Sequence, residues 1–125
     1  MKVKRTERGW AGHFICADRC LFRRNTLLER GDIKIVISTV GAMQDIHKEG
    51  RFERIGCDRY YETMAFHSKK DDKKYHDIDV NRQVYFNSEW VINELYADDK
   101  ANKMHEKVVK EISRELLAGN KYNEG

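Results

Sequence analysis

The spacing of apolar residues along the chain changes near residue 85. Before that point apolar and polar residues alternate in short runs, which is the pattern of half-buried β-strands. The strongest run, residues 33–40, is rich in β-branched residues and places Ile33, Ile35 and Ile37 on one face. After residue 85 apolar residues recur every three or four positions, which is the period of an amphipathic helix. The pattern predicts strands first and helices last.

Turn signals between the alternating runs define the expected strands. These strands are residues 13–16, 20–28, 33–40, 52–55, 59–67 and 75–80. The first two form a hairpin around residues 17–19, and Gly31 and Asp32 break the chain before the third. Residues 69–74 carry charges of both signs and form a solvated hairpin tip, which requires no functional explanation.

Two helices are expected after the strands. A short helix, capped by Asn87 or Ser88, continues to about residue 95. Asp98 or Asp99 caps a longer helix, and Gly119 stands where a left-handed terminating residue belongs. The apolar positions of the longer helix are Ala101, Met104, Val108, Ile112 and Leu116.

These elements define one α+β domain over residues 1–125, an antiparallel sheet of five to six strands followed by a short helix and a long C-terminal helix. Strands occupy about 13–80 and helices about 88–118. The lack of proline and of a Gly/Ser-rich linker argues against a second domain. One long helix can cover only one face of the sheet, so we expect a homodimer or higher homo-oligomer that covers the other.

Composition and charge narrow the classes of partner. Charged residues make up 36% of the chain and apolar residues 40%, which is typical of a small globular domain with a densely charged surface. The net charge of +3, from 24 Lys and Arg against 21 Asp and Glu, is too small to indicate nucleic-acid binding, which needs a clustered basic face. The excess of cations lies near the start of the chain, where it could hold an anion.

The sequence predicts neither a membrane protein nor a secreted one. No stretch approaches the roughly 18 apolar residues of a membrane span, and charged residues 1–8 precede no apolar signal-peptide core. Cys16, Cys20 and Cys57 form an odd set without the dense spacing of a disulfide scaffold. We expect reduced, buried thiols and a cytoplasmic location.

Residue types for catalysis or metal binding are present, but not in the spacing of a known site. His13, Cys16, Cys20 and Cys57 could supply four zinc ligands, yet they include no Cys-x-x-Cys pair. Serine and histidine occur in no nucleophile motif. The sequence therefore predicts a binding protein rather than an enzyme, with no metal and no cofactor.

Residues 20–26 carry the strongest indication of ligand binding. Arg23 and Arg24 are neighbours in a predicted strand, so they point to opposite faces and one of them should face an occupied side. A guanidinium group there needs an anionic ligand or a carboxylate, for which Glu62 and Glu89 are the alternatives. Asn25 could read a base edge or a hydroxyl group. The aromatic candidates for stacking a nucleobase, which otherwise belong to the core, are Trp10, Tyr60 and Phe86.

Segments of small phage and prophage proteins resemble four parts of this chain, namely RGWAGHF at 8–14, CLFRRNT at 20–26, STVG at 38–41 and RYYETM at 59–64. With its length and order of elements, the chain is similar to the Thoeris anti-defence sponge family. The resemblance implies a phage protein in the cytoplasm of a host bacterium. Such a protein sequesters a cyclic ADP-ribose isomer, an immune signal made by a TIR enzyme, without cleaving it.

The resemblance also implies an expected dimer, whose interface could enclose the ligand. Arg114 or His105 from the predicted helix would then contribute to the pocket, although both could be ordinary solvated residues. The alternative function is a phage inhibitor that acts by protein or nucleic-acid contact, as anti-CRISPR proteins do. An enzyme that degrades the same signals is a third class, and it would need a histidine pair or a metal.

Overall fold

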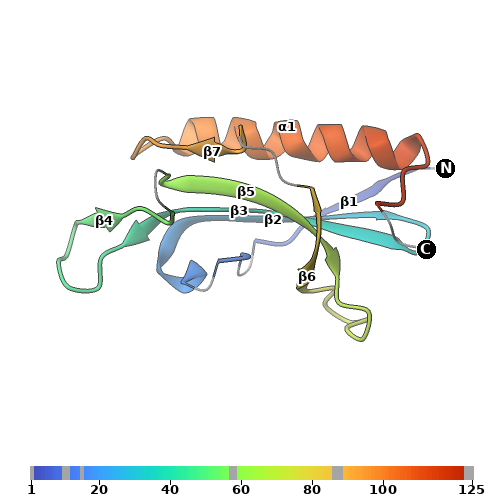
Figure 1. Ribbon diagram of the computed structural model, residues 1–125, viewed down its shortest axis with the longest axis horizontal. Helices are drawn as coiled ribbons and strands as arrows, with labels where there is room; N and C mark the ends of the chain where they lie inside the picture. The colour runs from blue at the N-terminus through green and yellow to red at the C-terminus, as the bar shows by residue number, and fades with distance from the viewer. Residues whose placement is uncertain (1, 10–11, 15, 57–58, 86–88, 123–125) are drawn as a thin grey trace.

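The computed structural model describes residues 2–9, 12–14, 16–56, 59–85 and 89–122. It shows an α+β fold in which a seven-stranded antiparallel sheet carries a long helix along one face (Figure 1). The strands are β1 (Lys4–Glu7), β2 (Cys20–Arg30), β3 (Ile33–Gln44), β4 (Phe52–Glu53), β5 (Tyr61–Ser68), β6 (Ile78–Tyr85) and β7 (Val91–Ile92). A 3-10 helix, η1 (Ala17–Arg19), precedes β2, and the long helix is α1 (Asp98–Leu117).

The sheet is built around β3. The strand order is β1-β2-β3-β5-β6, with β4 paired to β3 and β7 paired to β5. β2 and β3 form the longest hairpin, and its register pairs Arg30 with Ile33 around the predicted turn. Gly31 occupies the left-handed region there, with φ of 59°, which a residue without a side chain adopts at little cost. Every residue of β3 from Ile35 to Met43 is buried, as expected for the β-branched run of a central strand.

We call the side of the sheet that α1 covers the helix face, and the opposite side the far face. On the helix face, Leu28, Ile35 and Ile37 pack in one cluster with Val108 and Ile112 of α1. Fully burying a side chain of this size contributes roughly 1.5–3 kcal/mol to the free energy of unfolding. The predicted apolar positions of the long helix are therefore confirmed as the face that holds it on the sheet.

The far face is covered by the chain itself, which corrects the expectation of a face with nothing over it. Val36 and Phe66 pack there with Ile78, and each of the three is 5% exposed or less. Near the other end of the sheet, the segment around η1 lies beneath the strands and packs Ala17 against Val40 (Figure 1). Because the far face is not bare, it gives no argument for a homodimer, and the dimer stays a prediction.

The predicted hairpin of residues 13–16 with β2 is wrong. The described residues of that segment form bends and a turn, and β1, which the pattern did not reveal, pairs with β2 instead. In this pairing Thr6 lies opposite Leu27. The charged sequence of β1 hides its role because it is an edge strand, where polar side chains are common.

The predicted short helix is also wrong within the described residues. Val91 and Ile92 form β7, which pairs with Tyr61 and Glu62 at the start of β5. β6 pairs only with the later part of β5. The backbone groups at the start of β5 therefore need other partners. The segment before α1 supplies them, for example through the Thr63 N–H bond of 3.0 Å to the Trp90 carbonyl. The predicted capping residues Asn87 and Ser88 lie outside the described residues.

The long helix begins and ends at the predicted places, but its start is anchored differently. The N-cap is Ala97, without a capping side chain, so Asp98 and Asp99 do not cap it. The hydroxyl group of Tyr61 instead accepts the Ala97 N–H at 3.0 Å and donates to Asp98 Oδ1 at 2.8 Å. Gly119 follows the helix with φ of 92°, as predicted for its end. No described helix is long and apolar enough to cross a membrane.

Candidate functional site

A cavity of about 420 Å³ lies at the end of the sheet where β3 begins, β5 ends and the β5–β6 connection turns. Its size falls within the roughly 300–1,000 Å³ that small-molecule sites occupy. The lining residues are Asp32, Lys34, His67, Ser68, Lys69, Lys70, Asp72, Lys73, His76 and Arg82. Five of these are Lys or Arg and two are Asp, which leaves three excess positive charges when the histidines are neutral. The cavity is therefore suited to an anion.

The Asp72 carboxylate forms hydrogen bonds within the β5–β6 connection, which makes one wall of this cavity. Its Oδ1 accepts the Tyr75 N–H at 2.9 Å, and its Oδ2 accepts the Asp77 N–H at 3.3 Å. The hydrogen bond from the Tyr75 N–H, with that from Asp77, lowers the pKa of Asp72 below its ordinary value. Asp72 forms no ion pair among the described residues, but its charge still offsets one of the five cations of the cavity.

Two arginines donate hydrogen bonds to backbone carbonyl groups at the β5–β6 connection, which forms this wall of the cavity. Arg82 of β6 donates to Asp79 Oδ2 at 3.0 Å and also to the backbone carbonyl of Ser68 across the hairpin. Arg8, which follows β1, donates to the carbonyl groups of Tyr75 and His76, at 3.1 Å for the latter. His76 itself has φ of 51°, an uncommon conformation for a residue with a side chain. These contacts hold the charged tip in one conformation.

Three lysines of the cavity have their charge available for a ligand. Lys34, Lys69 and Lys73 take part in no ion pair among the residues that the structure describes. His67, by contrast, is only 5% exposed, and its Nε2 lies 2.9 Å from the Tyr122 carbonyl, to which it donates. The cavity thus combines available ammonium groups with a fixed wall.

The arginines predicted from the sequence lie elsewhere. Arg24 is on the helix face, where its guanidinium group donates to Glu7 at 3.0 and 2.9 Å and to Glu106 at 3.0 Å. Arg5 donates to the same Glu106 at 2.8 and 2.6 Å. These hydrogen bonds, first that of Arg5, lower the pKa of Glu106 to about 2. A salt bridge is therefore found at Arg24, with partners other than the two glutamates expected from the sequence.

His105 belongs to a buried chain of hydrogen bonds under α1. Its Nε2 lies 2.7 Å from Thr26 Oγ1, and its Nδ1 lies 2.7 Å from Thr39 Oγ1. Thr26 Oγ1 donates to Glu7 Oε2 at 2.6 Å, so it must accept from His105 Nε2–H. Thr39 then donates to Nδ1 and can accept from Thr63 Oγ1 at 2.6 Å. This arrangement uses the neutral imidazole, and His105 is fully buried.

Asn25 and Arg23 lie on the far face. Asn25 is fully buried, and its Oδ1 accepts from Arg8 Nε at 2.9 Å. Arg23, two positions earlier along β2, is exposed. The alternation of a strand separates both residues from Arg24 and His105, which lie on the helix face. The expected opposite orientation of the two arginines is therefore confirmed.

The remaining predicted residues are at separate places. Tyr60 lies below the Arg54 guanidinium group, whose carbon is 5.5 Å from the ring centroid. Arg114, near the end of α1, lines a depression of about 280 Å³. Trp10 and Phe86 lie outside the described residues. Within the described part of the chain, Arg24 and His105 share one network, and the other predicted residues join no common pocket with them.

A serine, a histidine and a glutamate lie within hydrogen-bond distance of one another on the far face, although no sequence motif predicts this group. His13 Nδ1 lies 3.0 Å from Ser38 Oγ, and its Nε2 lies 2.9 Å from Glu62 Oε1. Arg59 also donates to Glu62, at 3.2 Å. Ser38 is fully buried and the His13 side chain is 3% exposed, so a substrate has no access to the hydroxyl group. The group fastens residues 12–14 to the sheet.

Sequence reasoning missed the cavity because its residues come from distant parts of the chain. Residues 69–74 were interpreted as a solvated tip, and alone they are one. Only the β3–β5 pairing, which places Ile35 beside His67, brings Lys34 to the same end of the sheet. The available signal was the lysine pairs at 69–70 and 73–74, which exceed the two aspartates between them.

Comparison with known proteins does not assign the chain to a family. No protein family model, no curated protein and no solved structure matches it.

Proposed function

We propose that the protein binds a small phosphorylated ligand in the cationic cavity and sequesters it without cleaving it. The observation that supports this proposal is a cavity of about 420 Å³ lined by five Lys and Arg residues, of which Lys34, Lys69 and Lys73 form no ion pair among the described residues. Ammonium and guanidinium groups bind phosphate oxygens through charge-assisted hydrogen bonds, which are stronger than neutral ones. A ligand with two adjacent phosphates would use several of these groups at once.

The resemblance to the Thoeris anti-defence sponges suggests which phosphorylated ligand to test first. A cyclic ADP-ribose isomer carries a pyrophosphate, which matches the charge of the cavity. The proposal then describes a phage anti-defence protein that removes an immune signal in the cytoplasm of its host. Arg24 and His105, which the sequence suggested as ligand contacts, serve in this proposal to hold α1 on the sheet.

Sequestration also needs high affinity, which bears on the oligomeric state. A dissociation constant of 1 nM corresponds to about 12 kcal/mol, and a small ligand reaches it only when most of its surface is enclosed. Lys69, Lys70 and Lys73 are exposed, so one chain leaves the ligand partly open to solvent. We propose that a second copy of the chain completes the enclosure, as expected for a homodimer.

The proposal is tested by incubating the protein with cyclic ADP-ribose isomers, removing free nucleotide, denaturing the protein by heat and identifying the released compound by mass spectrometry. Intact nucleotide released in stoichiometric amount supports sequestration. Altered nucleotide would instead identify an enzyme. Absence of any bound nucleotide would leave the contact inhibitor as the better function, and a partner protein or nucleic acid should then raise the melting temperature.

A charge-matched pair of variants locates the site. Replacing Lys34, Lys69 and Lys73 by Gln should weaken ligand binding by roughly tenfold for each ammonium group that binds a phosphate oxygen. The control replaces Lys2, Lys48 and Arg51 by Gln, which removes the same charge from exposed positions outside the cavity. Equal loss of affinity in both variants would mean that the ligand does not bind in this cavity.

A further inference from the structure

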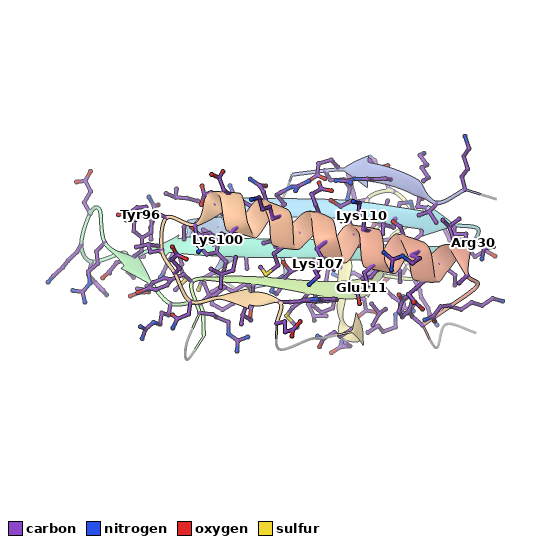
Figure 2. The ribbon with its side chains drawn as sticks, turned by 90° about the horizontal axis from the view of Figure 1, so that it is seen from above. Arg30, Tyr96, Lys100, Lys107, Lys110 and Glu111 are labelled. Carbon is purple, nitrogen blue, oxygen red and sulfur yellow. The ribbon has the colours of Figure 1, made fainter. Side chains whose placement is uncertain are left out.

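The outer side of α1 carries a row of five cations, Lys100, Lys103, Lys107, Lys110 and Arg114, which we call the cationic row. The positions are separated alternately by three and four residues, so at 3.6 residues per turn they fall within an arc of about 80°. At 1.5 Å per residue the row is about 21 Å long. All five residues are exposed, and Figure 2 looks down on this side of the helix.

Carboxylates beside this row neutralise only part of its charge. Glu111 of α1 and Glu89 line one depression with Lys107, Lys110 and Arg114. Glu106 is drawn to the edge of the helix by its bonds to Arg5 and Arg24. Lys100 pairs with Glu94, at 2.5 Å. The other four cations of the row take part in no ion pair among the described residues. Because like charges on one helix face destabilise it slightly, a bound anion would relieve their repulsion.

We propose that the cationic row docks on the phosphate backbone of a nucleic-acid duplex. Duplex DNA carries one negative charge per roughly 1.7 Å of axis, so a contact as long as the row faces more phosphates than it has cations. The small net charge of the chain argued against this class of partner, but the helix concentrates its cations on one side. The row shares no residue with the cationic cavity, so this inference stands or falls independently of the proposed function.

The composition of the row favours a duplex over other anionic surfaces. Protein–protein interfaces are depleted in lysine, whereas four of these five residues are lysines. A helix that inserts into a membrane surface uses an accessible apolar face, and that of α1 is buried on the sheet, so only the electrostatic attraction to anionic lipids would remain. The row contains no aromatic residue on which an unpaired base could stack. Contacts to phosphates alone carry no sequence information, so binding should not depend on sequence.

The test is fluorescence anisotropy with a labelled duplex of about 24 base pairs and arbitrary sequence, titrated with the intact protein between about 50 and 200 mM KCl. Four to five phosphate contacts predict a slope of log K against log salt of about −3.6 to −4.5. The affinity should therefore fall by a factor of roughly 150 to 500 over this range. A second duplex of unrelated sequence should bind equally well.

Two variants with equal charge change separate the row from general electrostatics. Replacing Lys103, Lys107, Lys110 and Arg114 by Gln should abolish most of the salt dependence. Replacing Lys2, Lys4, Lys48 and Arg51 by Gln should preserve most of it. Circular dichroism confirms that each variant is folded.

Three results would overturn the inference. The first is that the intact protein does not bind the duplex at about 50 mM salt. The second is that the two variants lose affinity equally. The third is that poly-glutamate or anionic lipid vesicles bind through the row while the duplex does not, which would assign it to an acidic protein or a membrane surface.

Discussion

His105 of α1 and Thr39 of β3 are joined by a buried hydrogen bond of 2.7 Å between Nδ1 and Oγ1. The other ring nitrogen of His105 bonds Thr26 on β2, so one side chain ties the helix to two strands. Protonation of Nδ1 would place a hydrogen where the Thr39 hydroxyl hydrogen now points. Burial, followed by the charge of Arg24, lowers the pKa of His105 to about 4.

This pKa predicts a loss of stability in mild acid. Between the ordinary histidine pKa of 6.5 and about 4, the unfolded chain binds a proton at His105 that the folded chain does not bind. The contribution of His105 to stability is therefore fully present above pH 6.5 and is lost as the pH falls towards 4. The shift corresponds to about 3 kcal/mol of unfolding free energy, measurable by urea unfolding at several pH values.

The His105→Leu variant isolates this contribution. At neutral pH it should be less stable by about 2 kcal/mol, because the variant cannot form the two buried hydrogen bonds. Between pH 6.5 and 4 its stability should fall less than that of the original protein. The exposed His47→Gln variant serves as the control, and an unchanged acid dependence in His105→Leu would contradict the prediction.

Replacing Tyr61 by Phe tests the anchor at the start of α1. The change removes the acceptor of the Ala97 N–H and the donor to Asp98, while the buried ring keeps its packing. We expect the free energy of unfolding to fall by about 2 kcal/mol, since Ala97 is 5% exposed and its N–H would have no partner. Hydrogen exchange should also become faster at the Ala97 amide. Tyr96→Phe, at a residue that is 79% exposed, should change neither quantity.

Gly41 has no room for a side chain. A Cβ atom there would lie 2.1 Å from Tyr61 Cδ2 and 2.8 Å from the Tyr60 carbonyl oxygen, both in closely packed surroundings. Gly41→Ala should therefore lower the free energy of unfolding by about 3 kcal/mol or more. Gly56→Ala is the control, because its nearest neighbour, at 3.1 Å, is the flexible side chain of Arg59. Similar melting temperatures for both variants would contradict this packing.

Asp32 gives a test of the cavity in which binding becomes tighter. It is exposed, lines the cavity and opposes its positive charge. Asp32→Asn should strengthen the binding of a phosphorylated ligand about two- to fivefold at low salt, and less at about 0.5 M salt because of screening. Isothermal titration calorimetry with the same nucleotide would measure it. Weaker binding in this variant would mean that Asp32 contacts the ligand directly.

Local patterns predicted the parts of the fold in which burial and periodicity agree. The run in β3 and the apolar positions of α1 are examples, because each element buries a face whose spacing is fixed by its own geometry. β1 and β7 escaped prediction because an edge strand and a two-residue strand owe their structure to the neighbour they pair with. No local sequence signal records that pairing.

The candidate site likewise separates into features that local sequence predicts and features that only the tertiary structure determines. From the sequence alone came the α+β order, the end of α1 at Gly119 and the opposite orientations of Arg23 and Arg24, since each depends on residues close together in the chain. Only the tertiary structure decided that Arg24 pairs with Glu7 and Glu106, and that Lys34 joins the tip at 69–73 around one cavity. Charges act through space, and the pairing of distant strands determines which of them meet.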